Sequence, residues 1–256
     1  MSLIKREEEI AFIEEGADIL SRVHGQVAQA IKPGVTTKQL DVLAEAFIRD
    51  YGGVPSFKGY GGFPAALCTS VNEYVVHGVP SSYVLEEGDI VSIDCGVYYK
   101  GFHSDAAFTY PVGIISDKLM RLLQVAKAAL YLGVREAKEG LRTGDIGYAI
   151  QRHVQQHGYS VVRELVGHGV GRLLHEAPQV PNYGRKGHGI RLKSGMVLAI
   201  EPMVNLGKQQ VVQENNGAFR TLDRQATAHF EHTVVVRDGC AEPLTTYKYV
   251  EAFLKF

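Results

Sequence analysis

Three features are scarce in this chain: cysteine, long apolar runs and an excess of charge of either sign. The three cysteines, Cys68, Cys95 and Cys240, are an odd number and form no C-x-x-C pair. This pattern argues against a disulfide framework and favours a reducing compartment. No segment approaches the ~20 consecutive apolar residues that a membrane helix needs. The charged N-terminal stretch MSLIKREEEIAFIEEG also lacks the apolar centre of a signal peptide.

The charges nearly cancel, with 27 basic against 28 acidic residues in a chain of 256. This balance indicates neither a nucleic acid nor an anionic membrane as a partner. The hydrophobic content of 45% is sufficient for one well-buried core, and the length is near the upper limit for a single core. We therefore expect residues 1–256 to form a single domain located in the cytoplasm.

What the chain does contain is the stretch DCGVYYKGFHSD, which places Asp94 and Asp105 11 residues apart within two predicted strands. Apolar residues lead into the first carboxylate and away from the second, and Lys100-Gly101 is placed to make the turn. A hairpin of this length can bring both carboxylates side by side at its centre. Because two buried like charges repel each other and lose hydration, the pair requires a cation or a shared proton.

Three more potential ligands lie in apolar or strand-like segments: His168 in ELVGHGVG, Glu201 in MVLAIEPMV and Glu231 in AHFEHTVVV. A glutamate within a hydrophobic strand rarely stays buried without a partner. Each of the five residues taken alone is more typical of a turn, a loop histidine or a strand end. Together, four carboxylates and one imidazole are too many for one tetrahedral zinc ion and suit two divalent ions that share bridging carboxylates. The resulting hypothesis is a two-metal hydrolytic centre.

Two amphipathic helices are predicted near the N-terminus. Residues 7–31 carry apolar side chains at spacings of three and four before Pro33-Gly34, and a second helix is expected from about Thr37, as N-cap, to Gly52. The segment at 32–52 aligns without gaps on the segment at 138–158. Either the chain has two pseudo-equivalent halves, or two amphipathic helix pairs are alike by chance. In the first case the five candidate ligands come from both halves and meet at their junction, where pockets are common.

Two further segments affect the interpretation. GHGVG at 167–171 superficially suggests nucleotide binding, but it lacks a third glycine at the required spacing and precedes LLHEAP rather than a clear helix, so we reject that function. Residues 161–184 are expected to begin as a strand and continue as a glycine-rich loop. The polar stretch KQQVVQENNGAFRTLDRQATAH is predicted to form a hairpin excursion.

In this order and spacing, the motifs resemble type I methionine aminopeptidases along nearly the whole chain. The matching stretches are VNEYVVHGVP at 71–80, DCGVYYKGFHSDAAFTYPVG at 94–113, GHGVGRLLHEAPQVPNYG at 167–184, GMVLAIEPM at 195–203 and FEHTVVV at 230–236. The resemblance implies an α+β fold of the pita-bread type, with a curved antiparallel sheet backed by helices, as a single catalytic peptidase domain. It also implies that the metal ligands are Asp94, Asp105, His168, Glu201 and Glu231, with Asp105 and Glu231 as bridges.

The resemblance further implies cofactors and residue roles. Two divalent ions (cobalt, manganese, iron or zinc) are expected, and Asn72 and Thr227 match positions near a structural monovalent-cation site. Glu201 would accept a proton, His175 would stabilise the developing oxyanion and His77 would contact the scissile amide. The substrate-binding residues would be Phe57, Tyr60, Phe63, Cys68, His77, His175 and Phe219. The sequence departs from the family pattern in having Phe219 for tryptophan and His229 for glutamine, and Leu174 occupies a variable pocket position.

The implied activity is removal of the N-terminal methionine from nascent proteins and peptides that have a small second residue. The expected partners are N-terminal peptide substrates, including ribosome-associated nascent chains, for an enzyme that acts as a monomer of the bacterial-like type. Two alternatives stay open. One is a proline-specific aminopeptidase or dipeptidase of the same fold, and the other is a non-catalytic binding protein on that scaffold.

Overall fold

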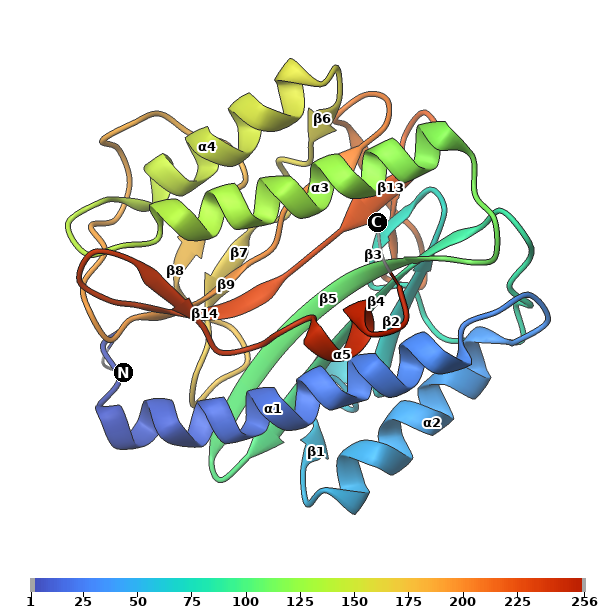
Figure 1. Ribbon diagram of the computed structural model, residues 1–256, viewed down its shortest axis with the longest axis horizontal. Coiled ribbons are helices and arrows are strands. Elements are labelled where there is room, and N and C mark those ends of the chain that lie inside the picture. The colour runs from blue at the N-terminus through green and yellow to red at the C-terminus, as the bar shows by residue number, and fades with distance from the viewer. Residues whose placement is uncertain (1–2, 255–256) are drawn as a thin grey trace.

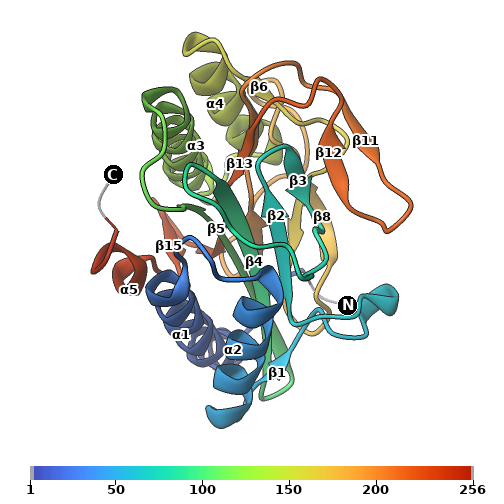
Figure 2. The ribbon, with the colours of Figure 1, turned by 90° about the vertical axis from the view of Figure 1, so that its right-hand side faces the viewer.

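The computed structural model describes residues 3–254, and two helix pairs flank its strands (Figure 1). The first pair is α1 (Glu7–Ala30) with α2 (Thr37–Asp50), and the second is α3 (Asp117–Glu136) with α4 (Thr143–Gln156). A short helix α5 (Lys248–Glu251) and a 3₁₀ turn η1 (Tyr60–Gly62) complete the described helical elements. Figure 2 shows α1 and α3 on one side of the strands, with β8, β11 and β12 on the other. The ends of the predicted domain, residues 1–2 and 255–256, lie outside the described residues.

Two larger antiparallel sheets form the centre of the fold. In the first, β4 (Ile90–Tyr99) pairs with β5 (Phe102–Pro111), β1 (Val54–Pro55) and β2 (Leu67–Val71). The second has the order β15 (Ala241–Pro243), β14 (His232–Val236), β9 (Val197–Ile200), β7 (Gly167–Gly169) and β8 (Glu176–Val180). Two smaller sheets have the orders β13 (Thr227–His229), β10 (Met203–Asn205), β6 (Ser160–Val161) and β11 (Val211–Gln213), β12 (Phe219–Thr221), β3 (Tyr74–Val76).

Most of the local predictions are confirmed, with two corrections. The polar stretch forms the β11–β12 hairpin. The segment expected to become a glycine-rich loop instead contains β7 and β8, because the backbone of Gly167–Gly169 pairs with both β8 and β9. The N-cap of α2 is Thr36 rather than Thr37: the Thr36 hydroxyl accepts the Gln39 N–H at 3.1 Å, whereas the Thr37 hydroxyl donates to the carbonyl of Ser81.

The DCGVYYKGFHSD stretch forms the predicted hairpin of β4 and β5. Lys100 and Gly101 make the turn with φ angles of +48° and +89°, a backbone conformation that favours glycine at one of the two positions. In the register, Asp94 lies opposite Ala107 and Asp105 lies opposite Gly96. The two carboxylates are therefore diagonal neighbours on the same face of the sheet.

The structure supports an internal duplication. Helices α2 and α4 begin and end at positions that differ by the same 106 residues. At the equivalent N-caps, Thr36 and Arg142, the backbone N–H donates at 2.8 Å to the side chain three residues later, Gln39 and Asp145. Each N-cap residue also forms an isolated bridge to a later segment, at Val84 and Arg191. Chance likeness of two helices does not account for equivalent caps and equivalent bridges. The two halves share one apolar core.

Aromatic side chains join the two halves at the centre of that core. Phe108, on β5, lies edge-on to Phe230, which follows β13, with ring centroids 4.9 Å apart. Tyr247 packs edge-on against Phe108 at 4.8 Å. Among residues 3–254, no helix combines the length and the apolarity required to span a membrane.

Candidate metal centre

The two larger sheets meet along β5 and β14, and the hydrogen bonds there fix the backbone beside the candidate ligands. Glu231 N–H donates to the carbonyl of Ala107 at 2.9 Å. The Thr233 hydroxyl accepts from Asp105 N–H at 2.9 Å and donates to the Asp105 carbonyl at 2.7 Å. The Tyr247 hydroxyl also donates to the Ala107 carbonyl at 2.7 Å. Asp105 and Glu231, which are far apart in sequence, are thereby held next to each other.

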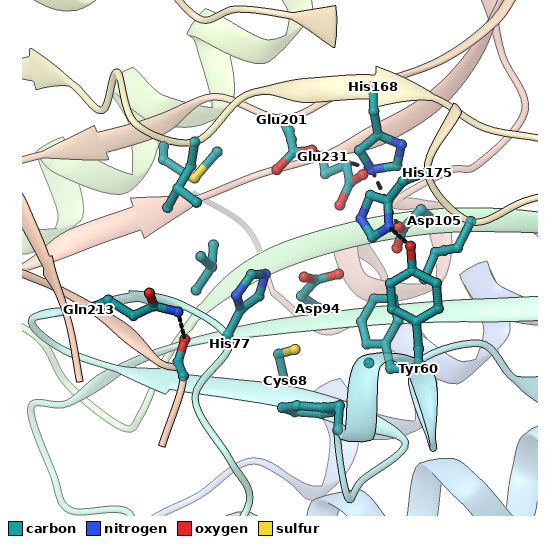
Figure 3. Close-up of a pocket in the computed structure, with 18 of the residues that line it drawn as sticks. Tyr60, Cys68, His77, Asp94, Asp105, His168, His175, Glu201, Gln213 and Glu231 are labelled. Atoms are coloured by element: carbon teal, nitrogen blue, oxygen red, sulfur yellow. Dashed lines mark hydrogen bonds and ion pairs between the residues drawn. The ribbon is translucent and has the colours of Figure 1, made fainter. Parts of the chain in front are cut away.

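All five predicted ligands line one cavity of about 450 Å³. Figure 3 shows their side chains converging from the β4–β5 hairpin and from the β7, β9 and β14 segments. Asp105, His168 and Glu231 are buried and offer ligand atoms that lie within 4.8 Å of one another. Asp94 and Glu201 retain some exposure to the cavity. The structure therefore brings together all five, with three of them in a tight group and the other two beside it.

His168 is oriented as a neutral ligand. Its Nδ1–H donates to the carbonyl of Gly169 at 2.8 Å, which leaves the lone pair of Nε2 facing the acids. Nε2 lies 3.6 Å from Oε1 of Glu201 and 3.9 Å from Oδ2 of Asp105. Burial lowers the pKa of His168 to about 4, with a smaller contribution from the neighbouring His175. The imidazole is therefore uncharged at neutral pH and able to coordinate a cation.

The raised pKa values of the four candidate carboxylates indicate a site that requires positive charge. Desolvation raises the pKa of Asp94 to about 7 and that of Glu201 to about 8. Desolvation, followed by repulsion from neighbouring acids, raises the pKa values of Asp105 and Glu231 well above their usual range. One oxygen each of Asp94, Asp105 and Glu231 is buried without a hydrogen-bond partner. Divalent cations would satisfy these oxygens and remove the repulsion, so the residues present fit a metal centre.

His77 enters the cavity from the segment after β3. Its backbone is in the left-handed region, with φ +60°, which is uncommon for a residue other than glycine. The following Gly78 packs so closely on β2 that a Cβ there would lie 2.2 Å from the Thr69 carbonyl oxygen. This close approach explains the HG pair: the glycine seats the backbone on β2, and the turn directs the histidine ring inward. Burial lowers the pKa of His77 to about 4, so the ring is neutral.

His175 faces the cavity beside His168, with ring centroids 4.3 Å apart. Its Nδ1 lies 2.8 Å from the Tyr60 hydroxyl, and partial burial lowers its pKa. The adjacent Glu176 anchors this segment through a buried ion pair with Lys5 at 2.7 Å and accepts a hydrogen bond from Leu173 N–H. The ion pair joins residues far apart in sequence, and sequence reasoning missed it.

One end of the cavity is apolar. Phe57, Cys68 and Leu174 form a buried cluster, against which Phe63 packs, and Tyr60 lies beside them in the cavity wall. Phe219, which was predicted to contact substrate, lies behind His77 and packs edge-on against that ring at 5.8 Å. Its contact with substrate stays a prediction.

Sequence reasoning also missed other parts of the wall. Leu165 and Met203 belong to a second apolar cluster near His77, and Gln213 and Asn216 project from the β11–β12 hairpin. His229 is buried with neither ring nitrogen hydrogen-bonded, and its Nε2 lies 3.6 Å from Oε2 of Glu201. The departure from glutamine at position 229 was visible in the sequence, but its proximity to Glu201 was not.

The two pseudo-symmetric halves and the acidic cluster at their junction define the class of protein: a metal-dependent hydrolase of the pita-bread fold. The description of metallopeptidase family M24 matches residues 11–238, and the chain belongs to this family.

Similar proteins agree with this assignment. A methionine aminopeptidase of Clostridium acetobutylicum is 49% identical over 247 residues, which cover 96% of this chain and 99% of the relative. The crystal structure of a methionine aminopeptidase from Thermotoga maritima superposes with a TM-score of 0.93 at 42% identity, covering 95% of this chain and 98% of that one. A prolidase from Pyrococcus furiosus has a TM-score of 0.77 at 25% identity, and the match spans 95% of this chain but only 65% of the prolidase. The resemblance to methionine aminopeptidases is confirmed.

Proposed function

We propose that this chain removes the N-terminal methionine from nascent proteins and peptides whose second residue is small. The observation that carries the proposal is one cavity with two ends: five candidate metal ligands at one end and an apolar pocket at the other. Phe57, Phe63 and Leu174, with the Cys68 thiol, give this pocket a soft, partly aromatic wall. Such a wall suits the flexible, polarisable thioether of methionine.

The candidate residues at the ligand cluster would bind both the metal ions and the amino terminus of the peptide. Asp105 and Glu231 would bridge two divalent ions, with Asp94, His168 and Glu201 as the remaining ligands. When bound, such ions polarise the scissile carbonyl and lower the pKa of water toward neutrality. Asp94, at the edge of the cluster, would also hold the free amino terminus of the peptide. Holding the amino terminus fixes the first peptide bond at the ligand cluster and so makes the enzyme an aminopeptidase.

Three side chains would handle protons and developing charge. Glu201 accepts the proton of the attacking water and returns it to the leaving amine. His175 donates a hydrogen bond to the oxyanion of the tetrahedral intermediate, and His77 contacts the scissile amide. Both rings are exposed within the cavity, where a substrate can reach them.

Cobalt, manganese, iron or zinc are the candidate ions, since oxygen-rich sites accept all of them. A monovalent cation near Asn72 and Thr227 would have to use carbonyl oxygens. The side chains there already have protein partners: the Asn72 amide donates to Asp89 at 2.8 Å, and the Thr227 hydroxyl lies 2.8 Å from the Asn205 side-chain oxygen.

We further propose that the chain functions as a single catalytic domain and a monomer in the cytoplasm, acting on ribosome-associated nascent chains as well as free peptides. The shared apolar core supports the single domain, because its residues come from both halves. The three free cysteines support a reducing compartment.

One assay tests the proposed activity. The protein is supplied in turn with each divalent ion and given Met-Ala-Ser or a proline-containing dipeptide. We expect release of methionine from Met-Ala-Ser and little cleavage of the dipeptide. Preferential cleavage of the dipeptide would favour the proline-specific alternative. If neither substrate is cleaved with any ion, the non-catalytic alternative gains support.

A further inference from the structure

A hydrogen bond joins the apolar pocket to the residue assigned to the oxyanion. The Tyr60 hydroxyl lies 2.8 Å from Nδ1 of His175, and the two rings are 5.1 Å apart at an interplanar angle of 42°. Figure 3 shows this contact at the cavity edge, with the other nitrogen of His175 turned toward the open space of the cavity. The phenol ring therefore belongs to the pocket wall, whereas its hydroxyl reaches the catalytic end.

We propose that Tyr60 is a positioning residue that donates its hydroxyl proton to Nδ1 of His175 and so holds this imidazole with its proton on Nε2. The inference rests on the proposed function, in which His175 is the oxyanion donor. A neutral imidazole carries one N–H, and only the tautomer with the proton on Nε2 presents a donor to the cavity. The opposite tautomer would present a lone pair to the oxyanion and repel it.

The direction of the hydrogen bond follows from the chemistry of the two groups. A phenol O–H is more acidic than a neutral imidazole N–H, and an imidazole nitrogen is a more basic acceptor than a phenol oxygen. Donation from Tyr60 to Nδ1 is therefore the stronger of the two arrangements. His168 is fixed in the other tautomer. Its Nδ1 carries the proton, because this nitrogen donates to the Gly169 carbonyl. The two neighbouring histidines are held in opposite tautomers, His168 as a ligand and His175 as a donor.

The loop that carries Tyr60 is rich in glycine. Gly59, Gly61 and Gly62 all have positive φ angles, and a Cβ at any of them would meet open space. Gly59 N–H donates to the Phe63 carbonyl at 2.8 Å, which closes the loop. The glycines thus allow a tight loop whose one large projecting side chain is Tyr60. Phe57 and Phe63, which belong to the apolar pocket, flank the same loop.

The test is direct observation of the His175 tautomer. Protein labelled with ¹⁵N-histidine and loaded with diamagnetic zinc is compared with Tyr60→Phe by long-range ¹H–¹⁵N correlation spectroscopy, and His175→Gln identifies the signals. We expect the wild type to carry the proton on Nε2 and Tyr60→Phe to show a mixture of tautomers. On Met-Ala-Ser, kcat should fall by about 2- to 10-fold, the range that one neutral hydrogen bond covers, with KM within about twofold.

The matched control is Tyr98→Phe. Tyr98 also lies beside a histidine, His103, with tilted rings whose centroids are 4.7 Å apart, but Nδ1 of that histidine pairs with the Ser56 hydroxyl. This variant should leave the His175 signals and kcat unchanged. A wild-type spectrum with the proton on Nδ1, or a Tyr60→Phe protein with an unchanged tautomer and kcat, overturns the inference. If the wild type has no aminopeptidase activity, the proposed function fails, while the spectra still decide the tautomer.

Discussion

Thr233 and Asp105 exchange two hydrogen bonds across the junction of the two halves, although 128 residues separate them: the threonine hydroxyl accepts from Asp105 N–H and donates to its carbonyl. The candidate bridging ligand Asp105 is thus positioned by a side chain from the opposite half. The metal centre and the docking of the halves therefore depend on the same contact.

This relationship predicts the effect of Thr233→Val, which preserves shape and removes both bonds. The unfolding free energy should fall by about 1–3 kcal/mol, since each hydrogen bond contributes ~0.5–1.5 kcal/mol, and the affinity for Mn²⁺ should fall as well. Denaturant unfolding and calorimetric titration measure the two quantities. Thr233→Ser keeps the hydroxyl and loses one methyl group, worth about 0.8 kcal/mol. Equal metal affinities of the valine and serine variants would contradict the role of the hydroxyl.

The candidate bridging carboxylates, Asp105 and Glu231, predict opposite effects on the stability of the metal-free and the metal-loaded protein. Asp105→Asn and Glu231→Gln each remove a buried carboxylate whose pKa is raised by desolvation. Both variants should therefore melt at a higher temperature than the wild type when metal-free. They should also lose the stabilisation that bound Mn²⁺ gives the wild type, about 2.7 kcal/mol at a hundredfold excess over Kd, together with activity. Scanning calorimetry with and without Mn²⁺ measures the melting temperature of each variant and its stabilisation by the ion. Glu15→Gln, which removes a surface carboxylate paired with Lys100, is the control and should keep the metal response.

The same carboxylates predict how the stability of the metal-free protein depends on pH. A folded-state pKa of about 7 for Asp94 and about 8 for Glu201 means that the folded protein binds more protons than the unfolded chain, so stability is lost as pH rises through these values. Burial lowers the pKa values of eight histidines, which act in the opposite sense near and below their ordinary value of 6.5: His24, His77, His103, His153, His168, His175, His229 and His232. Above about pH 7 these histidines are neutral in the folded and the unfolded protein. Between about pH 7 and 8 the carboxylates therefore dominate, and the melting temperature should fall.

Thermal melts in EDTA across that pH range measure the fall in melting temperature. The variant Glu201→Gln should show a smaller dependence of melting temperature on pH. Saturating Mn²⁺ should reverse the trend, since the ion competes with protons and binds more tightly as pH rises. A melting temperature of the metal-free protein that rises from about pH 7 to 8 would show that the acids are not held protonated by the fold.

His175 provides a prediction that separates chemistry from metal binding. His175→Ala should bind Mn²⁺ like the wild type and lose about 10²- to 10³-fold in kcat, or ~2.7–4 kcal/mol of transition-state stabilisation. Metal analysis and turnover of Met-Ala-Ser measure the two properties. His157→Ala, at the exposed end of α4, is the control and should change neither. Full activity of His175→Ala would refute its assignment to the oxyanion.

The sequence was sufficient for features that depend on local pattern or on chemical type. Apolar spacing predicted α1 and α2, the Lys100-Gly101 turn predicted the β4–β5 hairpin, and acids in apolar strands indicated the metal cluster. The alignment of residues 32–52 with residues 138–158 predicted that α2 and α4 are equivalent helices, although it did not identify Thr36 as the N-cap of α2.

The sequence was not sufficient for contacts between distant segments. The Thr233–Asp105 bonds, the Lys5–Glu176 ion pair and the close packing of Gly78 on Thr69 have no local signature, because such partners are chosen by the packing of the two sheets. The position of Phe219 behind His77 shows the same limit: an aromatic residue can be recognised in the sequence, but the direction of its ring depends on the fold.

His229 gives the last prediction. Both of its ring nitrogens are buried without a hydrogen-bond partner, and Nε2 lies 3.6 Å from Oε2 of Glu201. A small movement would let an N–H there donate to Glu201 once that carboxylate is ionised by a bound cation, and such outer contacts typically change metal affinity by ~10- to 100-fold. His229→Leu should therefore bind Mn²⁺ more weakly by about this factor in calorimetric titration, whereas His229→Gln, which keeps an N–H donor, should bind within about threefold of the wild type. Equal affinities of the leucine and glutamine variants would show that His229 serves only to fill space behind the site.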